Sequence, residues 1–326
     1  MEFERRRVFF HDKDCDVKRH INLTLDGKLL YVATHNSKSD LVLIKEGHTE
    51  NVIWISIDIY SAESMQFIRQ HVRLKLTHPI YPRIKFSKCC KYLLVSTWYS
   101  VMIYNTENNN VETVYSEPYK VNMDTIVDSI LGVGEKYYAF TTYSYIDDTV
   151  CIIIRHTGND YNKQLDLKEA CFIKQIIASS NGDIVYISTN KGLIKWNPYI
   201  NRSVTYDKVD CICRFSSDDR YTVIAQKGEN GLHIDVCPAN NPKNVLFKFD
   251  YQMGKWATEN DIQFCKQHAN IYLISIFDTL FYINLYTCTM IDTTELNGGN
   301  PENIILHGST LYTLYYESIC KNVPIL

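Results

Sequence analysis

The sequence lacks a long apolar run. None of its hydrophobic stretches approaches the roughly 18 uninterrupted apolar residues of a membrane-spanning helix, and the N-terminal stretch MEFERRRVFFHDKD has no apolar segment typical of a secretory signal peptide. We therefore expect a soluble, cytoplasmic protein with no transmembrane segment.

The sequence also lacks a large surplus of one charge, and it lacks cysteines in the CxxC spacing of metal ligands. The 34 Lys and Arg and 37 Asp and Glu give a formal net charge of -3, so the chain as a whole is not drawn to nucleic acid or anionic membranes. None of the 11 cysteines stands in a CxxC pair, and the closest spacings are Cys89-Cys90 and Cys211-x-Cys213. Because a structural zinc site needs four ligands, we expect reduced, mostly buried thiols and no metal.

Catalytic and cofactor signatures are also missing. The chain has no GxSxG or HExxH motif, and Gly132-Val133-Gly134 lacks the third glycine of a dinucleotide fingerprint. Asp12, Asp14 and Asp16 resemble the start of a calcium loop, but Val17 stands where that loop requires Gly. We predict a protein without cofactors that is not an enzyme; a catalytic site assembled in a central channel stays open as an alternative.

What the sequence does contain is a turn followed by an aromatic or aliphatic strand, repeated seven times. The copies are residues 23–34, 85–97, 130–142, 177–189, 214–226, 264–276 and 305–316. Most are spaced near the roughly 40 to 50 residues of one four-stranded blade. The repeat predicts an all-β fold, a single seven-bladed β-propeller domain over residues 1–326 built of four-stranded antiparallel blades.

The clearest blade lies between Pro82 and Glu117. Turn residues divide it into four expected strands, which are Ile84 to Phe86, Tyr92 to Ser96, Val101 to Tyr104 and Val111 to Tyr115. The seventh copy, in contrast, has only SICKNVPIL after it and is one strand short. Arg6 to His11 is a strand without a partner, so we predict that this N-terminal strand completes the last blade and closes the ring.

Two segments also fit helical spacing, namely residues 61–76 and 165–177. Helices there would favour an α/β fold instead.

The repeats resemble those of the WD-repeat propellers. Ile194-Lys195-Trp196-Asn197 stands where that family ends its third strand with Trp-Asp, and Ile103-Tyr104-Asn105 is a looser version. The turns Leu25 to Lys28 and Ser217 to Arg220 look like the first-hairpin turn of the family. The chain is divergent, because its one Gly-His pair, Gly47-His48, falls in an expected loop and no blade carries the full motif set.

A basic segment without Asp or Glu lies between Glu63 and Glu107. Its basic residues include Arg69, Arg73, Lys75, Arg83 and Lys85. If residues 65–75 form a strand, the period of two places Arg69, His71, Arg73 and Lys75 on one face. These charges either protect an outer strand from edge-to-edge pairing or form a docking patch for an anionic ligand, which would be an acidic partner, a phosphoinositide or a nucleic-acid backbone.

Aromatic residues gather in the expected loops. They are Tyr81, Trp98, Tyr99, Tyr143, Tyr145 and Trp256, and in a propeller the loops concerned share one face. The competing interpretation is that a chain with 24 Tyr has aromatic residues everywhere. We predict a non-catalytic scaffold that binds protein partners through this aromatic face, with a phosphate-binding module at the basic flank as the alternative.

Overall fold

The computed structural model describes most of the chain. The described residues are 2–9, 17–24, 26–36, 40–45, 48–77, 83–87, 90–97, 100–116, 125–131, 137–144, 149–156, 162–167, 173–179, 182–228, 231–252, 262–268, 270–277, 279–295, 303–307, 310–315 and 318–325. Every regular element within them is a β-strand, and the strands form seven antiparallel sheets. The helical alternative is therefore wrong for the described parts of 61–76 and 165–177, which contain β6, β14 and β15.

Five sheets consist of four strands that follow one another in sequence, as the repeat predicts. Sheet C holds β7 (Arg83–Phe86), β8 (Tyr92–Ser96), β9 (Ser100–Asn105) and β10 (Val111–Ser116). Sheet D holds β11 (Thr125–Leu131), β12 (Tyr137–Ser144), β13 (Thr149–His156) and β14 (Asn162–Leu167). Sheet E holds β15 (Ile173–Ala178), β16 (Val185–Thr189), β17 (Gly192–Asn197) and β18 (Arg202–Tyr206). Sheet F holds β19 (Ile212–Phe215), β20 (Tyr221–Lys227), β21 (Gly231–Pro238) and β22 (Phe247–Gln252), and sheet G holds β23 (Ile262–His268), β24 (Ile271–Ile276), β25 (Thr279–Asn284) and β26 (Thr289–Glu295).

The other two sheets depart from the predicted blade. Sheet A joins β27 (Asn303–His307), β28 (Thr310–Tyr315) and β29 (Ser318–Ile325) to β1 (Glu2–Phe9) from the other end of the chain. Sheet B has five strands, which are β2 (Val17–Leu23), β3 (Leu29–Asn36), β4 (Asp40–Lys45), β5 (His48–Ser61) and β6 (Phe67–Thr77). Seven uniform blades were predicted; five sheets match that description and two differ from it. His48, expected in a loop, begins β5.

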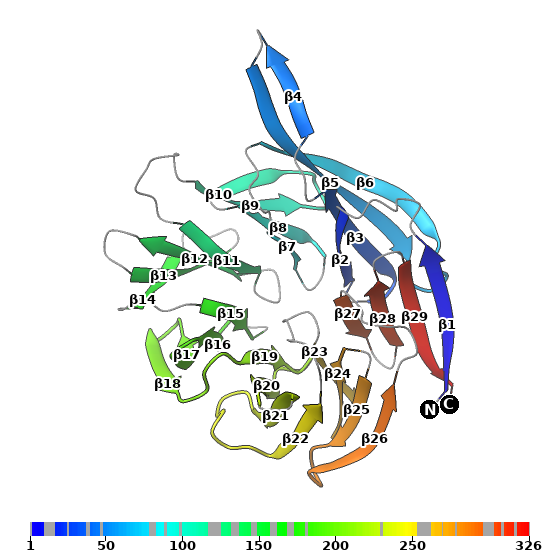
Figure 1. The fold of residues 1–326 in the computed structure, drawn as a ribbon, viewed down its shortest axis with the longest axis vertical. Coiled ribbons are helices and arrows are strands. Elements are labelled where there is room, and N and C mark those ends of the chain that lie inside the picture. The colour runs from blue at the N-terminus through cyan, green and yellow to red at the C-terminus, as the bar shows by residue number, and fades with distance from the viewer. Residues whose placement is uncertain are drawn as a thin grey trace.

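The sheets are arranged around a common centre (Figure 1). The first strand of each consecutive set lies innermost, and neighbouring inner strands contact one another in the order β2, β7, β11, β15, β19, β23 and β27. β27 in turn contacts β2. β1 pairs with β29 over its whole length, from Glu2 opposite Ile325 to Phe9 opposite Ser318, which brings the two chain ends together. The predicted N-terminal strand therefore exists, but it begins at Glu2 rather than Arg6.

Apolar side chains fill the spaces between neighbouring sheets. One cluster joins sheets F and G, and another joins D and E around Trp196, which is completely buried. Further clusters join A to B, B to C, E to F and G to A. A sheet with neighbours on both sides buries both faces, which is why a strand such as β16 (VYIST) is buried at all five positions instead of alternating.

A serine or threonine organises the turn between the first and second strands of four sheets. Its hydroxyl accepts the backbone N–H of the residue five positions later, at distances of 2.9 to 3.1 Å. The residue three positions later has a positive φ and donates its N–H to the backbone carbonyl of the Ser or Thr. The pairs are Thr24 and Gly27, Ser87 and Cys90, Ser179 and Gly182, and Ser216 and Asp219. This shared geometry is the physical origin of the repeated turn signal.

An asparagine organises the turn after the third strand of sheets C, E and G. The side-chain oxygens of Asn105, Asn197 and Asn284 accept the backbone N–H two residues later, at 2.9, 3.0 and 2.9 Å. In sheet E the buried Trp196 precedes this asparagine and donates its indole N–H to Asn201. An asparagine therefore ends the third strand in three of the seven sheets and holds the turn that leads into the fourth strand.

Removing residues 1–9 tests the contribution of β1. We expect the free energy of unfolding to fall by several kcal/mol, since each lost backbone hydrogen bond contributes about 0.5–1.5 kcal/mol, and aggregation to increase because β29 becomes an edge. Urea denaturation and light scattering measure the two effects. Replacing residues 1–9 with a Gly-Ser segment of equal length is the control for chain length and should behave like the deletion; an unaltered denaturation midpoint contradicts the role given to β1.

Asp218 predicts a pH dependence of stability. Its carboxylate accepts hydrogen bonds from Ser216 (2.7 Å) and from Tyr272 (3.0 Å), and it pairs with Lys266 of sheet G (3.2 Å). Burial by itself raises the pKa of Asp218, but these partners outweigh burial and leave the pKa below its usual value. The contribution is therefore present above the ordinary carboxyl pKa and is lost as the pH falls through the lowered one. Asp218→Asn should reduce stability at pH 7 and should make the loss of stability between pH 7 and pH 3 smaller than in the wild type. Denaturation midpoints measured from pH 3 to 7 test this. Parallel curves of midpoint against pH for the two proteins would contradict it.

Candidate interaction surface on sheet B

β6 is the outer strand of sheet B. Among the described strands it pairs only with β5. Two large apolar side chains are exposed on it, Phe67 at 56% and Ile68 at 50%, and Arg69, Arg73 and Lys75 are exposed as well. Large apolar and Arg side chains together are typical of the residues that anchor protein interfaces.

β6 has two bulges, at Ile68 and His71, and the one at His71 divides the predicted row of basic residues. Arg73 lies opposite Ser56 and Lys75 opposite Trp54, but the register shifts at His71, so that Arg69 lies opposite Ile59. Residues 54 and 56 of β5 share one face, whereas Ile59 belongs to the other face. Arg73 and Lys75 therefore lie on one side of the sheet and Arg69 on the other. The prediction that the four residues converge on one face is wrong, because period two does not continue across a bulge.

His71 is drawn into the packing between sheets B and C. Its Nε2 lies 2.5 Å from the carbonyl oxygen of Thr106, and its ring forms edge contacts with Tyr31 and Tyr104. It belongs to the interior of the fold and not to the basic surface.

Arg73 forms the best-defined contact of the surface. Its guanidinium carbon lies 4.5 Å from the ring centroid of the half-buried Trp54, a cation–π arrangement. Asp58 follows on the same face of β5, opposite Gln70. Burial raises the pKa of Asp58, although a hydrogen bond with Gln70 opposes this effect. Sequence reasoning missed Trp54, yet the alternation in Ile53-Trp54-Ile55-Ser56-Ile57-Asp58 already places Trp54 on the polar face of β5.

Arg83 and Lys85 lie elsewhere. Both belong to β7, the inner strand of sheet C, where Arg83 lies opposite Ser96 and Lys85 opposite Leu94. β6 is an outer strand, so the predicted flank of Arg69, Arg73, Lys75, Arg83 and Lys85 is not one surface. Sequence proximity was misleading because the chain passes from the outer edge of one sheet to the inner edge of the next.

The predicted aromatic face falls mostly outside the described residues. Tyr81, Trp98, Tyr99, Tyr145 and Trp256 are not among them, nor are Asp12, Asp14 and Asp16. Tyr143 was expected in a loop, but its backbone lies in β12, opposite Thr125 and Val150. The chain pairs there instead of turning because the hairpin of β12 and β13 extends to Ser144 and Thr149.

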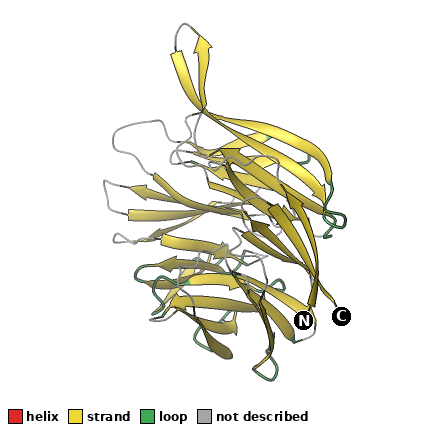
Figure 2. Cartoon of the chain, turned by 45° about the vertical axis from the view of Figure 1, so that its right-hand side comes forward, coloured by secondary structure: helices red, strands yellow, loops and turns green. Residues whose placement is uncertain are grey.

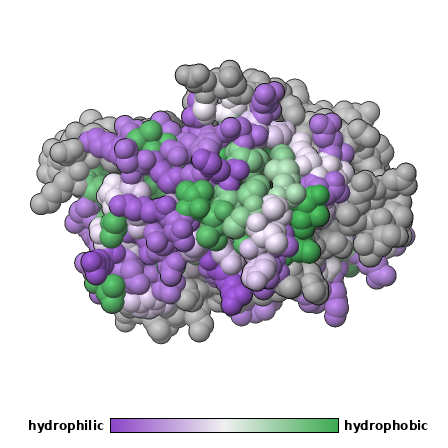
Figure 3. Space-filling model, turned by 90° about the horizontal axis from the view of Figure 1, so that it is seen from below, coloured by the Kyte–Doolittle hydropathy of each residue, from purple (hydrophilic) through white to green (hydrophobic). Residues whose placement is uncertain are grey.

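Exposed apolar residues outside sheet B lie mainly on outer strands and the turns that precede them. In sheets E and G they are Tyr199, Ile200, Val204, Tyr286, Met290 and Ile291. Figure 3, which views the molecule from below, shows apolar groups surrounded by hydrophilic ones. Sheet E has an exposed arginine, Arg202, on the same strand as Val204, and sheet B differs in that its Arg73 stacks on Trp54.

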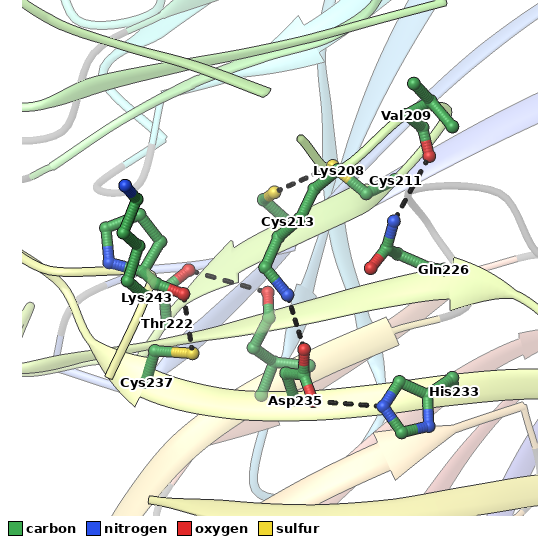
Figure 4. Close-up of polar contacts among 12 residues, drawn as sticks. Lys208, Val209, Cys211, Cys213, Thr222, Gln226, His233, Asp235, Cys237 and Lys243 are labelled. Atoms are coloured by element: carbon green, nitrogen blue, oxygen red, sulfur yellow. Dashed lines mark hydrogen bonds and ion pairs between the residues drawn. The ribbon is translucent and has the colours of Figure 1, made fainter. Parts of the chain in front are cut away.

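A polar cluster in sheet F has a structural role (Figure 4). Asp235 of β21 is buried and pairs with Lys208 of the segment that leads into β19, and with His233 Nε2 at 3.2 Å. The other ring nitrogen of His233 lies 2.8 Å from Asp250. Both ring nitrogens thus lie within reach of a carboxylate. The cluster fastens the incoming segment to the sheet.

The cysteines next to this cluster are buried thiols. Cys211 and Cys213 have sulfurs 3.8 Å apart and are packed with Cys237 in the core between sheets E and F. The thiol–thiol hydrogen bond lowers the pKa of Cys211 and, together with burial, raises that of Cys213; burial raises the pKa of Cys237 to about 12. Six of the eight described cysteines are buried, as predicted.

No group of three or more His, Cys, Asp and Glu within the described ranges is arranged to hold a metal ion. Nor does any helix there have the length and apolar character needed to cross a bilayer.

Comparison with known proteins shows the fold alone. No family model matches the chain, and no curated protein matches its sequence. Similar solved structures include the β-propeller domain of Cps50 (Swd1) from Myceliophteria thermophila, with 13% identity, TM-score 0.56, and coverage of 98% of this chain and 100% of that one. The Dos1 propeller has 9% identity, TM-score 0.60, and coverage of 98% and 94%. An oligogalacturonate lyase in complex with manganese has 8% identity, TM-score 0.57, and coverage of 99% and 98%. Propellers that differ this much in sequence include an enzyme, so the fold does not decide the function.

A double-mutant cycle tests the geometry of β6. Trp54→Ala and Arg73→Ala should show a coupling energy of about 0.5–1 kcal/mol in urea denaturation, because each removes one partner of the cation–π contact. The matched cycle of Trp54→Ala with Arg69→Ala should show no coupling, since Arg69 lies on the opposite face. Equal coupling energies in the two cycles would contradict the bulge at His71, because Arg69 and Arg73 would then lie on the same face as Trp54.

Proposed function

We propose that the protein is a non-catalytic, cytoplasmic scaffold for protein–protein interactions, built as a closed ring of seven blades. Three observations support the closed ring. The described strands form seven sheets, the inner strands contact one another in cyclic order, and β1 pairs with β29. Ring closure removes the two free edges of a linear array and makes the surface rigid.

The proposal depends on a group of four residues on β5 and β6. Arg73 stacks on Trp54, Lys75 lies opposite Trp54, and Phe67 is exposed at the other end of the same outer strand. We define these four residues as the β6 surface. A partner with an acidic and apolar segment fits it, because carboxylates pair with the two cations while apolar side chains cover the aromatic rings. A preformed sheet loses little conformational entropy when it binds.

The aromatic loop residues form a second proposed contact. Trp98 and Tyr99 lie in the connection between β8 and β9, Tyr145 in that between β12 and β13, and Trp256 in that between β22 and β23. In a propeller such connections lie on one side of the ring. The anionic-ligand alternative is less favoured than a protein partner, since the five predicted basic residues are divided among three places and do not converge on one phosphate.

Comparative co-purification tests the proposal. Tagged wild-type protein, Arg73→Glu, and Trp98→Ala with Tyr99→Ala are used as bait, and bound proteins are quantified by mass spectrometry. Arg202→Glu is the matched control, because Arg202 is an exposed arginine on β18, an outer strand of sheet E. We expect at least one specific partner to be retained by the control and reduced more than about tenfold by Arg73→Glu, the effect of 1.4 kcal/mol.

Two outcomes would contradict the proposal. If wild type and both variants bind the same set of partners, neither proposed surface binds a protein partner. The second outcome is that no protein partner is found and the purified protein binds phosphoinositide vesicles with a steep salt dependence. If Arg73→Glu abolishes this binding, the phosphate-binding alternative is favoured.

A further inference from the structure

The outer strand β6 has one regular stretch, residues 72–77. Both of its bulges, at Ile68 and His71, lie before this stretch, which pairs with residues 52–57 of β5 without a shift. No described strand pairs with the other edge of β6. In Figure 1 β6 lies on the side of β5 away from the centre of the ring, and Figure 2 shows the same long strands after a turn of 45°. The stretch has the length of an ordinary strand. We call residues 72–77 the β6 edge.

The two faces of the β6 edge differ in character. Arg73 and Lys75 are exposed and share the face that carries Trp54 of β5. Leu74 and Leu76 share the other face, where Leu76 is buried and Leu74 packs against the apolar cluster between sheets B and C. β6 contains no Asp or Glu. The edge therefore alternates between cationic and apolar positions with the period of two of a strand.

Exposed apolar surface also lies on sheet C, on the side that faces β6. Val111 of β10 is 54% exposed and lies opposite Tyr104. Because the ring of Tyr104 contacts that of His71 of β6, this face of sheet C is the one turned toward sheet B. Apolar side chains on this side of an added strand would extend the apolar layer between the two sheets.

We propose that the β6 edge binds an extended segment of a partner protein in which acidic and apolar residues alternate. This inference rests on the proposed function, since it takes the β6 surface to be a contact with a protein. The segment pairs antiparallel with residues 72–77, as a further strand of sheet B. Residues directly opposite one another in a sheet share a face, so acidic residues of the segment lie opposite Arg73 and Lys75. Apolar residues of the segment lie opposite Leu74 and Leu76.

The charges of the β6 edge select an acidic partner over a second copy of the chain. In an antiparallel pair of two β6 edges centred on Leu74, Arg73 of each copy would lie opposite Lys75 of the other, and like charges directly opposite are destabilising. Such charges protect an edge from pairing with itself. The same two cations attract carboxylates. A guanidinium that is stacked on an indole keeps its N–H donors around its rim, so Arg73 binds a carboxylate without leaving Trp54.

Synthetic peptides test the pairing of strands. The peptide Ser-Val-Glu-Val-Glu-Val-Ser places two glutamates on one face with the spacing of Arg73 and Lys75, and a second peptide has Lys in place of Glu. Two further versions of the glutamate peptide are N-methylated, one at both glutamates and the other at two valines. Alternate N–H groups of a strand point to opposite edges, so each version loses the donors of one edge. Binding to the full-length protein is measured by fluorescence anisotropy at low salt.

We expect the glutamate peptide to bind, and the lysine peptide to bind at least about tenfold more weakly. One of the two N-methylated versions should lose binding by a similar factor while the other retains it, because only one edge of the peptide pairs with β6. The double variant Arg73→Glu with Lys75→Glu should reverse the preference and bind the lysine peptide. Arg202→Glu on sheet E is the control and should behave as wild type, and circular dichroism checks the fold of each variant.

Two results overturn the proposal. One is that the glutamate peptide does not bind at about 1 mM. The other is that the two N-methylated versions bind equally, because the peptide is then not held as a strand. If either result is found while Arg73→Glu still removes a co-purified partner, the proposed function stands and only the pairing of strands is wrong. If the peptides behave as expected but no co-purified protein depends on Arg73, the proposed function is the one that fails.

Discussion

Five of the seven sheets, A, B, E, F and G, bury apolar side chains against neighbours on both sides, and this constraint governs the rest of the structure. The clusters between D and E, E and F, F and G, G and A, A and B, and B and C each take side chains from two sheets. A sheet at the end of a linear array would expose one apolar face to water, at about 25 cal/mol for each Å² of apolar surface. The cyclic order of the inner strands and the pairing of β1 with β29 follow from the same requirement.

The turns allow the packing to repeat although the sequence does not. A Ser or Thr hydroxyl holds the first turn in sheets B, C, E and F, and an Asn side chain holds the third turn in C, E and G. Both devices need one polar side chain and a following residue that tolerates positive φ, and they leave other positions unconstrained. This explains how the chain shares the fold of propellers to which it is only 8 to 13% identical.

The proposed interaction surface lies where the repeat is broken. Sheet B contains the extra strand β4, and the bulge of β6 at His71 separates Arg69 from Arg73 and Lys75. A regular blade would turn each of these charges to one face and would lack β4. Insertions and bulges at an edge add contacts without disturbing the buried inner strands, which is why they are tolerated here.

The sequence by itself determined the strands, the turns and the blade repeat. The boundaries of β8 agree with those expected from residues 92–96, and the buried position of Trp196 at the end of a third strand follows from the WD-repeat-like pattern. These features are local, since they depend on period-two alternation and on turn residues within a few positions of one another. Only the tertiary structure decided that Arg83 and Lys85 lie apart from Arg73, that His71 is drawn between two sheets, and that Arg73 stacks on Trp54. Each of these depends on a bulge or on the path between sheets, and neither leaves a periodic signal in the sequence.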